Sequence, residues 1–150
     1  MTVHLVKMAV GIDSLDHLAE VQKQRRAKLK ADRGKAILIH KTRNTPKRAA
    51  EIVGSDGMGA GSIYWIIKGF IRVRQRILGF EKGVGREGKP FCEIRLNPKL
   101  LRTVPLPHKP MQGWRYLEDA DKPADLTGKA AEAEEMPPEM MLKLRELGLL

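Results

Sequence analysis

Ser62 to Glu81 carries the residues whose types and spacing best suit a chemical role, and that role is contact with a polyanion. The segment SIYWIIKGFIRVRQRILGFE alternates with the two-residue period of a β-strand. Its even positions carry cations interleaved with aromatic rings, namely Tyr64, Lys68, Phe70, Arg72, Arg74 and Arg76. Its odd positions carry Ile63, Trp65, Ile67, Ile71, Val73 and Ile77. We therefore expect one face to pack on a core and the other to face an anionic partner, of which nucleic acid is the leading example.

A second group of cations lies in KTRNTPKRAAEIVG. Lys47 and Arg48 fall in the first turn of an expected helix, with Arg43 just upstream. Cations at a helix N-terminus oppose the helix dipole, so this placement indicates either an anion held at the helix start or side chains that simply point into water.

A third candidate is the segment MQGWRYL, in which Trp114 and Tyr116 flank Arg115. Aromatic rings beside an arginine can stack a base and hold its phosphate. The same rings can also close the edge of a hydrophobic core, and the sequence leaves both interpretations open.

No residue pattern predicts catalysis, a metal site or a cofactor. The histidines His4, His17, His40 and His108 are scattered without metal-binding spacing. Cys92 is the single cysteine and lies in an expected strand, which is typical of a small core residue. An enzyme acting on a phosphorylated or nucleotide substrate is the alternative. It would use Lys68 or the arginines as clamps and needs an acid or base, for which the candidates are Glu51, Glu81 and Glu93.

Charge is distributed unevenly along the 150 residues, whose formal net charge is +10. Residues 1–116 hold 24 Lys and Arg against 9 Asp and Glu, a net charge of +15, whereas residues 117–150 hold 4 against 9, a net charge of −5. No apolar run approaches the ~18–20 residues of a membrane span. A lone cysteine and no secretory pattern predict a cytoplasmic protein without membrane contact.

The remaining sequence predicts the elements that must position these side chains. Expected strands span 3–10, 36–40, 91–96 and 100–106. The strand 91–96 should pair as a hairpin with the segment Ser62 to Glu81, which must itself bulge or turn at Gly69. Expected helices run from an Asp13 N-cap to about Lys30 and from a Thr45 N-cap to Gly54. The glycine-rich stretch 54–61 reads as a flexible connection, because it follows a helix where a nucleotide-binding loop would follow a strand.

The C-terminal third differs in composition from the body, a basic α+β domain expected over residues 1–117. Residues 118–136 are acidic and poor in large apolar side chains, so we expect a loosely held linker that could lie over the basic face and compete with nucleic acid. Residues 137–150 predict a short helix with Met140, Leu144 and Leu147 on one face. That helix would dock on the body or on a second copy, giving a homodimer and allowing a purely structural adaptor role.

The segments HLVK, TPKRA, YWIIKG with RQRIL, and QGWRYL resemble those of an uncharacterised bacterial family, the domain of unknown function 1489. The family has no established activity, so the resemblance implies no catalytic residue. A fold-level analogy also links the expected elements to PUA-like domains of the ASCH and EVE groups, small mixed barrels that hold RNA or a modified base.

Together these observations predict an α+β fold. We expect a small mixed, mostly antiparallel β-sheet or PUA-like barrel with two main helices and a short C-terminal helix. We also expect a nucleic-acid-binding module, with RNA as the ligand and the reading of a modified base as an option. Its expected contact residues are Arg43, Lys47, Arg48, Tyr64, Lys68, Arg72, Arg74, Arg76, Trp114 and Arg115.

Overall fold

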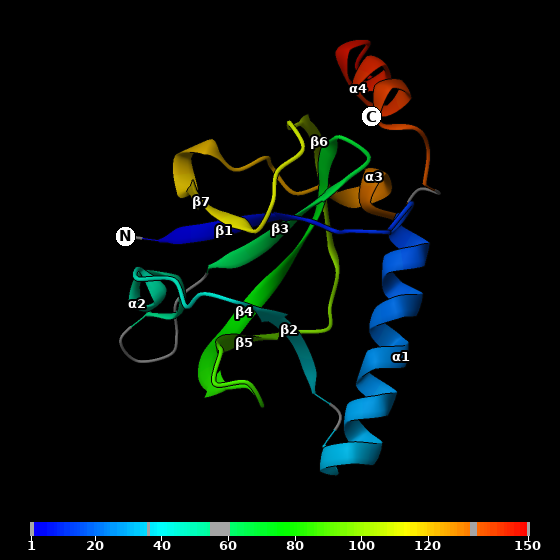
Figure 1. The fold of residues 1–150 in the computed structure, drawn as a ribbon. Helices are drawn as coiled ribbons and strands as arrows, with labels where there is room; N and C mark the ends of the chain where they lie inside the picture. The colour runs from blue at the N-terminus through cyan, green and yellow to red at the C-terminus, as the bar shows by residue number, and fades with distance from the viewer. Residues whose placement is uncertain (1, 36, 55–60, 133–134, 150) are drawn as a thin grey trace.

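A computed structural model describes residues 2–35, 37–54, 61–132 and 135–149 of the chain (Figure 1). Its strands are β1 (Val3–Met8), β2 (Leu38–Thr42), β3 (Ser62–Ile67), β4 (Phe70–Val84), β5 (Pro90–Leu96), β6 (Leu101–Pro107) and β7 (Trp114–Glu118). Its helices are α1 (Leu15–Arg33), α2 (Ala49–Val53), the 3₁₀ turn η1 (Asp119–Asp121), α3 (Gly128–Glu132) and α4 (Pro138–Glu146). Residues 55–60 of the expected glycine-rich connection lie outside the described residues.

The α+β prediction is confirmed. Over the described residues the strands form a seven-stranded sheet in the order β2-β5-β4-β3-β1-β7, with β6 paired to β4. Only the β1–β3 ladder is parallel among these pairs, and the other ladders are antiparallel. The sheet is open, because β2 and β7 end the order without pairing to each other, so the alternative of a closed barrel is not realised. Its main core lies between the sheet and α1 and includes Leu5, Ile63 and Trp65.

The segment 62–81 is a hairpin and not one bent strand. A two-residue turn at Lys68 and Gly69 joins β3 to β4, with Ile67 opposite Phe70. Both turn residues have positive φ, 48° and 84°. This matches the type I′ turn that suits the natural twist of a hairpin, in which glycine is favoured because it has no Cβ.

The expected two-faced alternation breaks within β4. Arg72 has no partner on β3, because Ile71 pairs with Ile66 and the next pair is Val73 with Trp65. A bulge of this kind adds one residue and reverses the faces on either side of it. Ile71 therefore packs in a second apolar cluster with Val6, Tyr64 and Ile66, on the face where the sequence predicted cations.

Two helix boundaries differ from the prediction. Ser14, not Asp13, caps α1, since its side chain accepts the His17 backbone N–H, while Gly34 ends the helix as expected. α2 begins at Ala49 with Arg48 at the N-cap position, so Thr45 does not serve as the cap. The segment around Lys47 is a turn instead of a first helical turn, and α2 has only 5 residues.

α1 is fixed to the sheet by a buried amide pair that hydrophobic patterning did not predict. The side chains of Gln22 and Gln75 exchange hydrogen bonds of 2.7 and 2.8 Å. The indole N–H of Trp65 donates to the same Gln75 oxygen at 2.8 Å. Buried polar groups are retained when they satisfy one another in this way.

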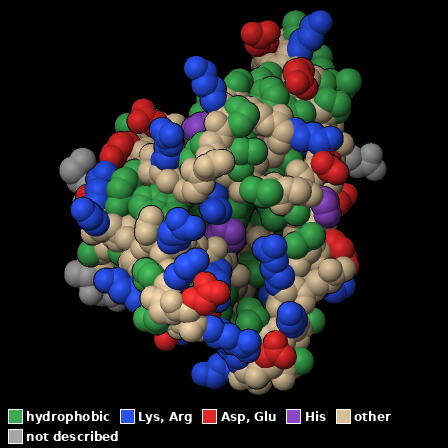
Figure 2. Space-filling view, in the orientation of Figure 1, with side chains coloured by type: hydrophobic (Ala, Val, Ile, Leu, Met, Phe, Trp, Pro, Cys, Tyr) green, Lys and Arg blue, Asp and Glu red, His purple; other side chains and the backbone are tan. Residues whose placement is uncertain are grey.

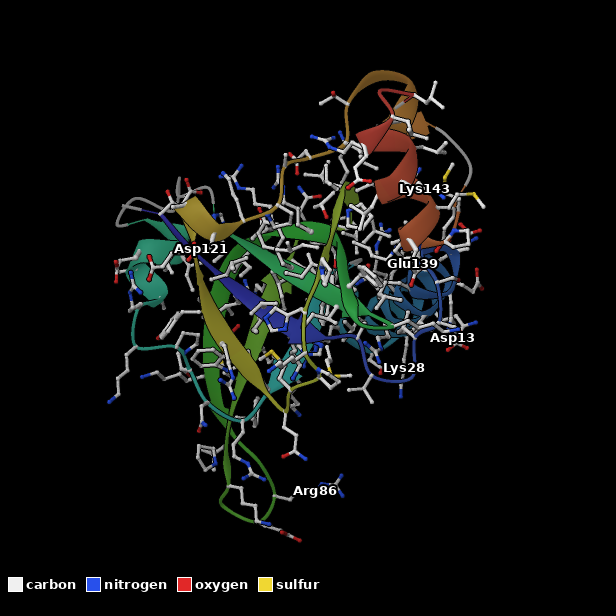
Figure 3. All side chains as sticks on the ribbon, turned by 90° about the horizontal axis from the view of Figure 1, so that it is seen from above. Asp13, Lys28, Arg86, Asp121, Glu139 and Lys143 are labelled. Atoms are coloured by element: carbon white, nitrogen blue, oxygen red, sulfur yellow. The ribbon has the colours of Figure 1, made fainter. Side chains whose placement is uncertain are left out.

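The acidic segment packs along β6 where it is described, although a loosely held linker was expected. Thr103 pairs with Asp125 in an isolated bridge, and Leu126 is buried. In Figure 3 the labelled Asp121 and Glu139 lie on opposite sides of the molecule. Between them, backbone hydrogen bonds join Val104 to Ala124 and Leu126 to Arg102. The segment is therefore part of the fold.

α4 presents a different face from the one predicted. Met141 is buried against the body, whereas Met140 and Leu147 are 52% and 64% exposed. Met140 and Leu147 therefore do not dock on the body, and a dimer through the face of Met140, Leu144 and Leu147 stays a prediction. Among the described residues, no helix has the length and apolar character needed to cross a membrane.

Candidate nucleic-acid interface

The arginines of β4 do not form one open cationic face. Arg72 is only 7% exposed, and its guanidinium contacts Glu135 at 2.9 Å and the Met136 carbonyl at 3.3 Å. Arg74 grips both carboxylate oxygens of Asp125 at 2.8 Å and donates to the Ser62 hydroxyl. The acidic segment thus supplies partners for two of the predicted contact residues, and its competition with nucleic acid stays a prediction.

An open surface of about 520 Å³ beside β4 keeps part of the predicted character. It is lined by Arg74, Arg76, Lys99, Lys122 and His4 among others, with no carboxylate among its lining residues. Arg74 and Lys122 are already engaged, by Asp125 and Asp119 respectively. This surface therefore offers less free positive charge than its composition suggests.

Tyr64 is not a stacking platform, because its ring is buried at 1% exposure. It packs edge-on against His4, with ring centroids 5.3 Å apart, and burial raises the pKa of its phenol to about 12. His4 is itself fixed, since its Nδ1 accepts the Ser62 N–H at 3.0 Å and its Nε2–H donates to Asp119 at 2.7 Å. Tyr64 and His4 therefore have structural roles, since each is buried and contacts other parts of the fold.

Arg48 supports an aromatic ring instead of presenting a free charge. Its guanidinium donates to Glu51 and Glu118, each at 2.7 Å, and its backbone N–H donates to the Tyr116 hydroxyl at 3.0 Å. The guanidinium carbon also lies 5.3 Å from the Tyr116 ring centroid, within range of a cation–π contact. Arg48 therefore positions Tyr116, and a phosphate held at this helix start stays a prediction.

Two other predicted contact residues point elsewhere. Lys68 sits at the β3–β4 turn, with its ammonium 4.0 Å from Asp13. Arg115 alternates with Trp114 and Tyr116 along β7, so it faces the opposite side of the strand. Arg115 cannot hold the phosphate of a base stacked on Trp114, as the sequence order had suggested.

Three of the predicted residues do meet, in an open groove of about 570 Å³ that we call the β2–β7 groove. It forms where the segment after β2, the β4–β5 hairpin and β7 converge. Its lining residues are Arg43, Asn44, Thr45, Lys47, Lys82, Gly83, Pro90, Phe91, Trp114 and Tyr116.

The aromatic rings of the groove are held in defined positions. Trp114 packs edge-on against Tyr116 with ring centroids 5.1 Å apart, and its indole N–H donates to the Asn44 carbonyl at 3.3 Å. Phe91 lies over Gly83, where an added Cβ would come within 2.3 Å of the ring. The Lys41 ammonium sits 4.1 Å from the centroid of the Phe91 ring.

The cations of the groove are Arg43, Lys47 and Lys82. All three are exposed, and none forms an ion pair with any residue that the structure describes. Among the residues that the structure describes, no carboxylate lines the groove. Positive charge beside aromatic faces, without internal neutralisation, is the combination that attracts a phosphate chain carrying flat bases.

Lys82, Phe91 and Tyr116 belong to this groove but were not among the predicted contact residues. Phe91 had one usable signal, since FCEIRL alternates and places Cys92, Ile94 and Leu96 on the core side, leaving Phe91 outside. No signal in the sequence indicated that Phe91 would lie near Arg43 and Trp114, because their proximity depends on strand pairing across the sheet.

Glu51, Glu81 and Glu93, the acid or base candidates of the enzyme hypothesis, lie outside the groove. Glu51 pairs with Arg48 at 2.7 Å, Glu93 with Arg33 at 3.0 Å, and Glu81 with Arg95. The Arg33 guanidinium lowers the pKa of the Glu93 carboxyl, first by hydrogen bonding. Within the described residues no group of His, Cys, Asp and Glu could hold a metal ion.

Comparison with known proteins identifies a family and no more. The family model described as "Protein of unknown function (DUF1489)" matches residues 5–150. No curated protein and no solved structure matches the chain. The chain therefore belongs to the DUF1489 family, as its motifs had suggested.

Proposed function

We propose that this member of the DUF1489 family binds single-stranded nucleic acid, with RNA as the ligand, in the β2–β7 groove. The observation that carries the proposal is the meeting of three cations with three aromatic rings in one groove. Among the described residues, these cations have no ion-pair partner and no carboxylate lines the groove. Bases stack on aromatic rings without regard to sequence, while cations neutralise the phosphates between them.

In this proposal the rings and the cations take separate parts of each nucleotide. Trp114, Tyr116 and Phe91 offer ring faces or edges to unstacked bases, and Arg43, Lys47 and Lys82 surround them with positive charge. Asn44 and Thr45, which also line the groove, offer polar groups to a ribose 2′-hydroxyl, the feature that separates RNA from DNA.

The proposal also concerns the location of the protein, the kind of base and the enzyme alternative. A cytoplasmic location in a bacterium fits the reduced, buried Cys92 and the family resemblance. Recognition of a modified base rests on the analogy with PUA-like domains that the expected elements suggested, although the sheet of this chain is open and not a closed barrel. The enzyme alternative gains nothing from the groove for its named acid or base candidates, because Glu51, Glu81 and Glu93 are not among its lining residues.

The test is a binding titration with fluorescently labelled, mixed-sequence single-stranded RNA at several salt concentrations. Replacing Arg43, Lys47 and Lys82 together by Gln should weaken low-salt binding at least tenfold. Each lost phosphate contact lowers the salt slope by ~0.7 for a single strand, so the slope should fall by about 2. Trp114→Leu should weaken binding by about 1–3 kcal/mol with less change in the salt slope.

The matched control replaces Lys23, Lys28 and Lys30 by Gln. These exposed residues lie on α1, away from the groove, and their loss changes the net charge equally. Equal weakening by both triple variants would show attraction to overall charge only and would overturn the groove as the site. Equal affinity for single-stranded RNA and DNA of the same sequence would overturn the choice of RNA.

A further inference from the structure

A second, smaller cavity of about 180 Å³ lies between the end of β1, α1 and the start of β2, and we call it the α1–β2 cavity. In Figure 2 the surface is hollowed between α1 and the sheet, with Lys or Arg side chains around the hollow. The cavity shares no lining residue with the β2–β7 groove. The proposed RNA site therefore does not account for it.

Lys7 places a cation where the sheet otherwise packs its core. Along β1, Val3 and Leu5 face the main core, and alternation brings Lys7 to the same face, beside Trp65 on β3. Lys7 is half-buried, and burial lowers the pKa of its ammonium. A cation at an inward-facing strand position is costly unless a charge of the opposite sign accompanies it.

No such opposite charge is found among the described residues. Arg25 of α1 also lines the cavity, so two cations border it and no carboxylate does. Neither Lys7 nor Arg25 forms an ion pair with a described residue. The electrostatics of the cavity are therefore those of a site for an anion.

The other walls are apolar or neutral. His40 packs edge-on against Trp65, with ring centroids 5.0 Å apart, and its buried Nε2 has no hydrogen-bond partner among the described residues. Burial, followed by the charges of Lys7 and Arg25, lowers the pKa of His40 to about 4, so the ring is uncharged near neutral pH. Met8, Ile12, Leu18, Val21 and Leu38 contribute apolar surface.

We propose that the α1–β2 cavity binds a small organic anion, a flat apolar body carrying one carboxylate or one phosphate. Lys7 and Arg25 hold the charged group at the rim, and the apolar body lies against Trp65 and the side chains of α1. The volume suits a single ring, since a cavity of about 150 Å³ accepts benzene. The proposal does not depend on RNA binding.

The test uses Trp65 as a reporter. The chain has 2 tryptophans, so Trp114→Phe leaves Trp65 as the sole indole fluorophore. Titration with benzoate and with phenyl phosphate separates the two anionic groups, and benzyl alcohol serves as the neutral analogue. We expect saturable fluorescence changes with at least one anion, at least tenfold tighter than with benzyl alcohol. The higher affinity identifies the carboxylate or the phosphate as the preferred group.

Lys7→Met and Arg25→Met should each weaken anion binding about tenfold. The control is Lys23→Met, because Lys23 is exposed on α1, like Arg25, but does not line the cavity, and this variant should leave anion binding unchanged. RNA affinity of Lys7→Met should stay at the parent value, which keeps this proposal separate from the first. Equal affinity for benzyl alcohol and the anions would overturn the proposal, as would an absence of saturable binding. Equal weakening by Lys23→Met would also overturn it.

Discussion

At the scale of single residues, His40 makes a clear prediction about pH. Its pKa of about 4 lies below the ordinary value of 6.5, so the folded chain binds fewer protons there than the unfolded chain does. Stability contributed by neutral His40 is therefore complete above pH 6.5 and is lost as the pH falls toward 4. Between pH 8 and pH 5 the free energy of unfolding should fall by about 2 kcal/mol from this residue.

The measurement is urea unfolding of the parent and of His40→Phe across pH 8 to 5. The variant should lose most of this dependence, with a remainder from His4, whose pKa burial also lowers. Carboxyl groups with lowered pKa values, such as Glu93 and Asp125, contribute mainly at more acidic pH. His108→Gln, at a position distant from the cavity, should keep the parent profile, and an unchanged profile in His40→Phe would contradict the prediction.

At the scale of elements, the β4–β5 hairpin sets one wall of the β2–β7 groove. Phe91 can lie over β4 only because Gly83 has no side chain, since a Cβ there would come within 2.3 Å of the ring. Gly83→Ala should displace the ring from Lys41 and from the groove, and it should weaken RNA binding at least fivefold, about 1 kcal/mol of lost stacking.

Gly79→Ala is a matched control on the same strand, because nothing lies within 4 Å of the Cβ that it would add. RNA titrations of the two variants, with thermal unfolding to confirm the fold, compare them directly. Equal RNA affinity in both variants would show that Phe91 takes no part in binding.

At the scale of the whole molecule, the acidic segment links α1, β4 and β6. Glu135 accepts a hydrogen bond from the Leu15 backbone N–H at the start of α1 and pairs with buried Arg72 of β4. Replacing Arg72, Arg74 and Arg76 together would therefore disturb the fold. Removing residues 118–150 would likewise expose the surfaces against which Leu126 and Met141 are buried. The charge on β4 serves the structure at least in part.

Arg72→Gln should lower the free energy of unfolding by about 3 kcal/mol, because it leaves Glu135 without its charged partner. Urea unfolding measures the loss. Lys68→Gln, an exposed cation in the same hairpin, should change stability by less than about 0.5 kcal/mol. Arg72→Met combined with Glu135→Leu should recover part of the lost stability. A loss from Arg72→Gln as small as that from Lys68→Gln would contradict the role of this ion pair.

The sequence by itself determined the fold class, most strand positions, a bulge or turn at Gly69 and the separation of a basic body from an acidic C-terminal segment. These features are local, since periodicity, glycine and proline positions and charge are properties of neighbouring residues. The sequence also singled out Arg43, Lys47 and Trp114 as candidate contact residues. It did not show that these three residues lie close together.

Only the tertiary structure decided which cations are free. The bulge at Arg72 reverses the faces of β4, and such a shift of register leaves no mark on the alternation itself. Asp125 and Glu135 reach their arginines from more than fifty residues away along the chain. The β2–β7 groove likewise joins segments 43–47, 82–91 and 114–116, which strand pairing alone brings together. Pairing partners follow from the packing of the whole chain, so no local pattern could have identified this site.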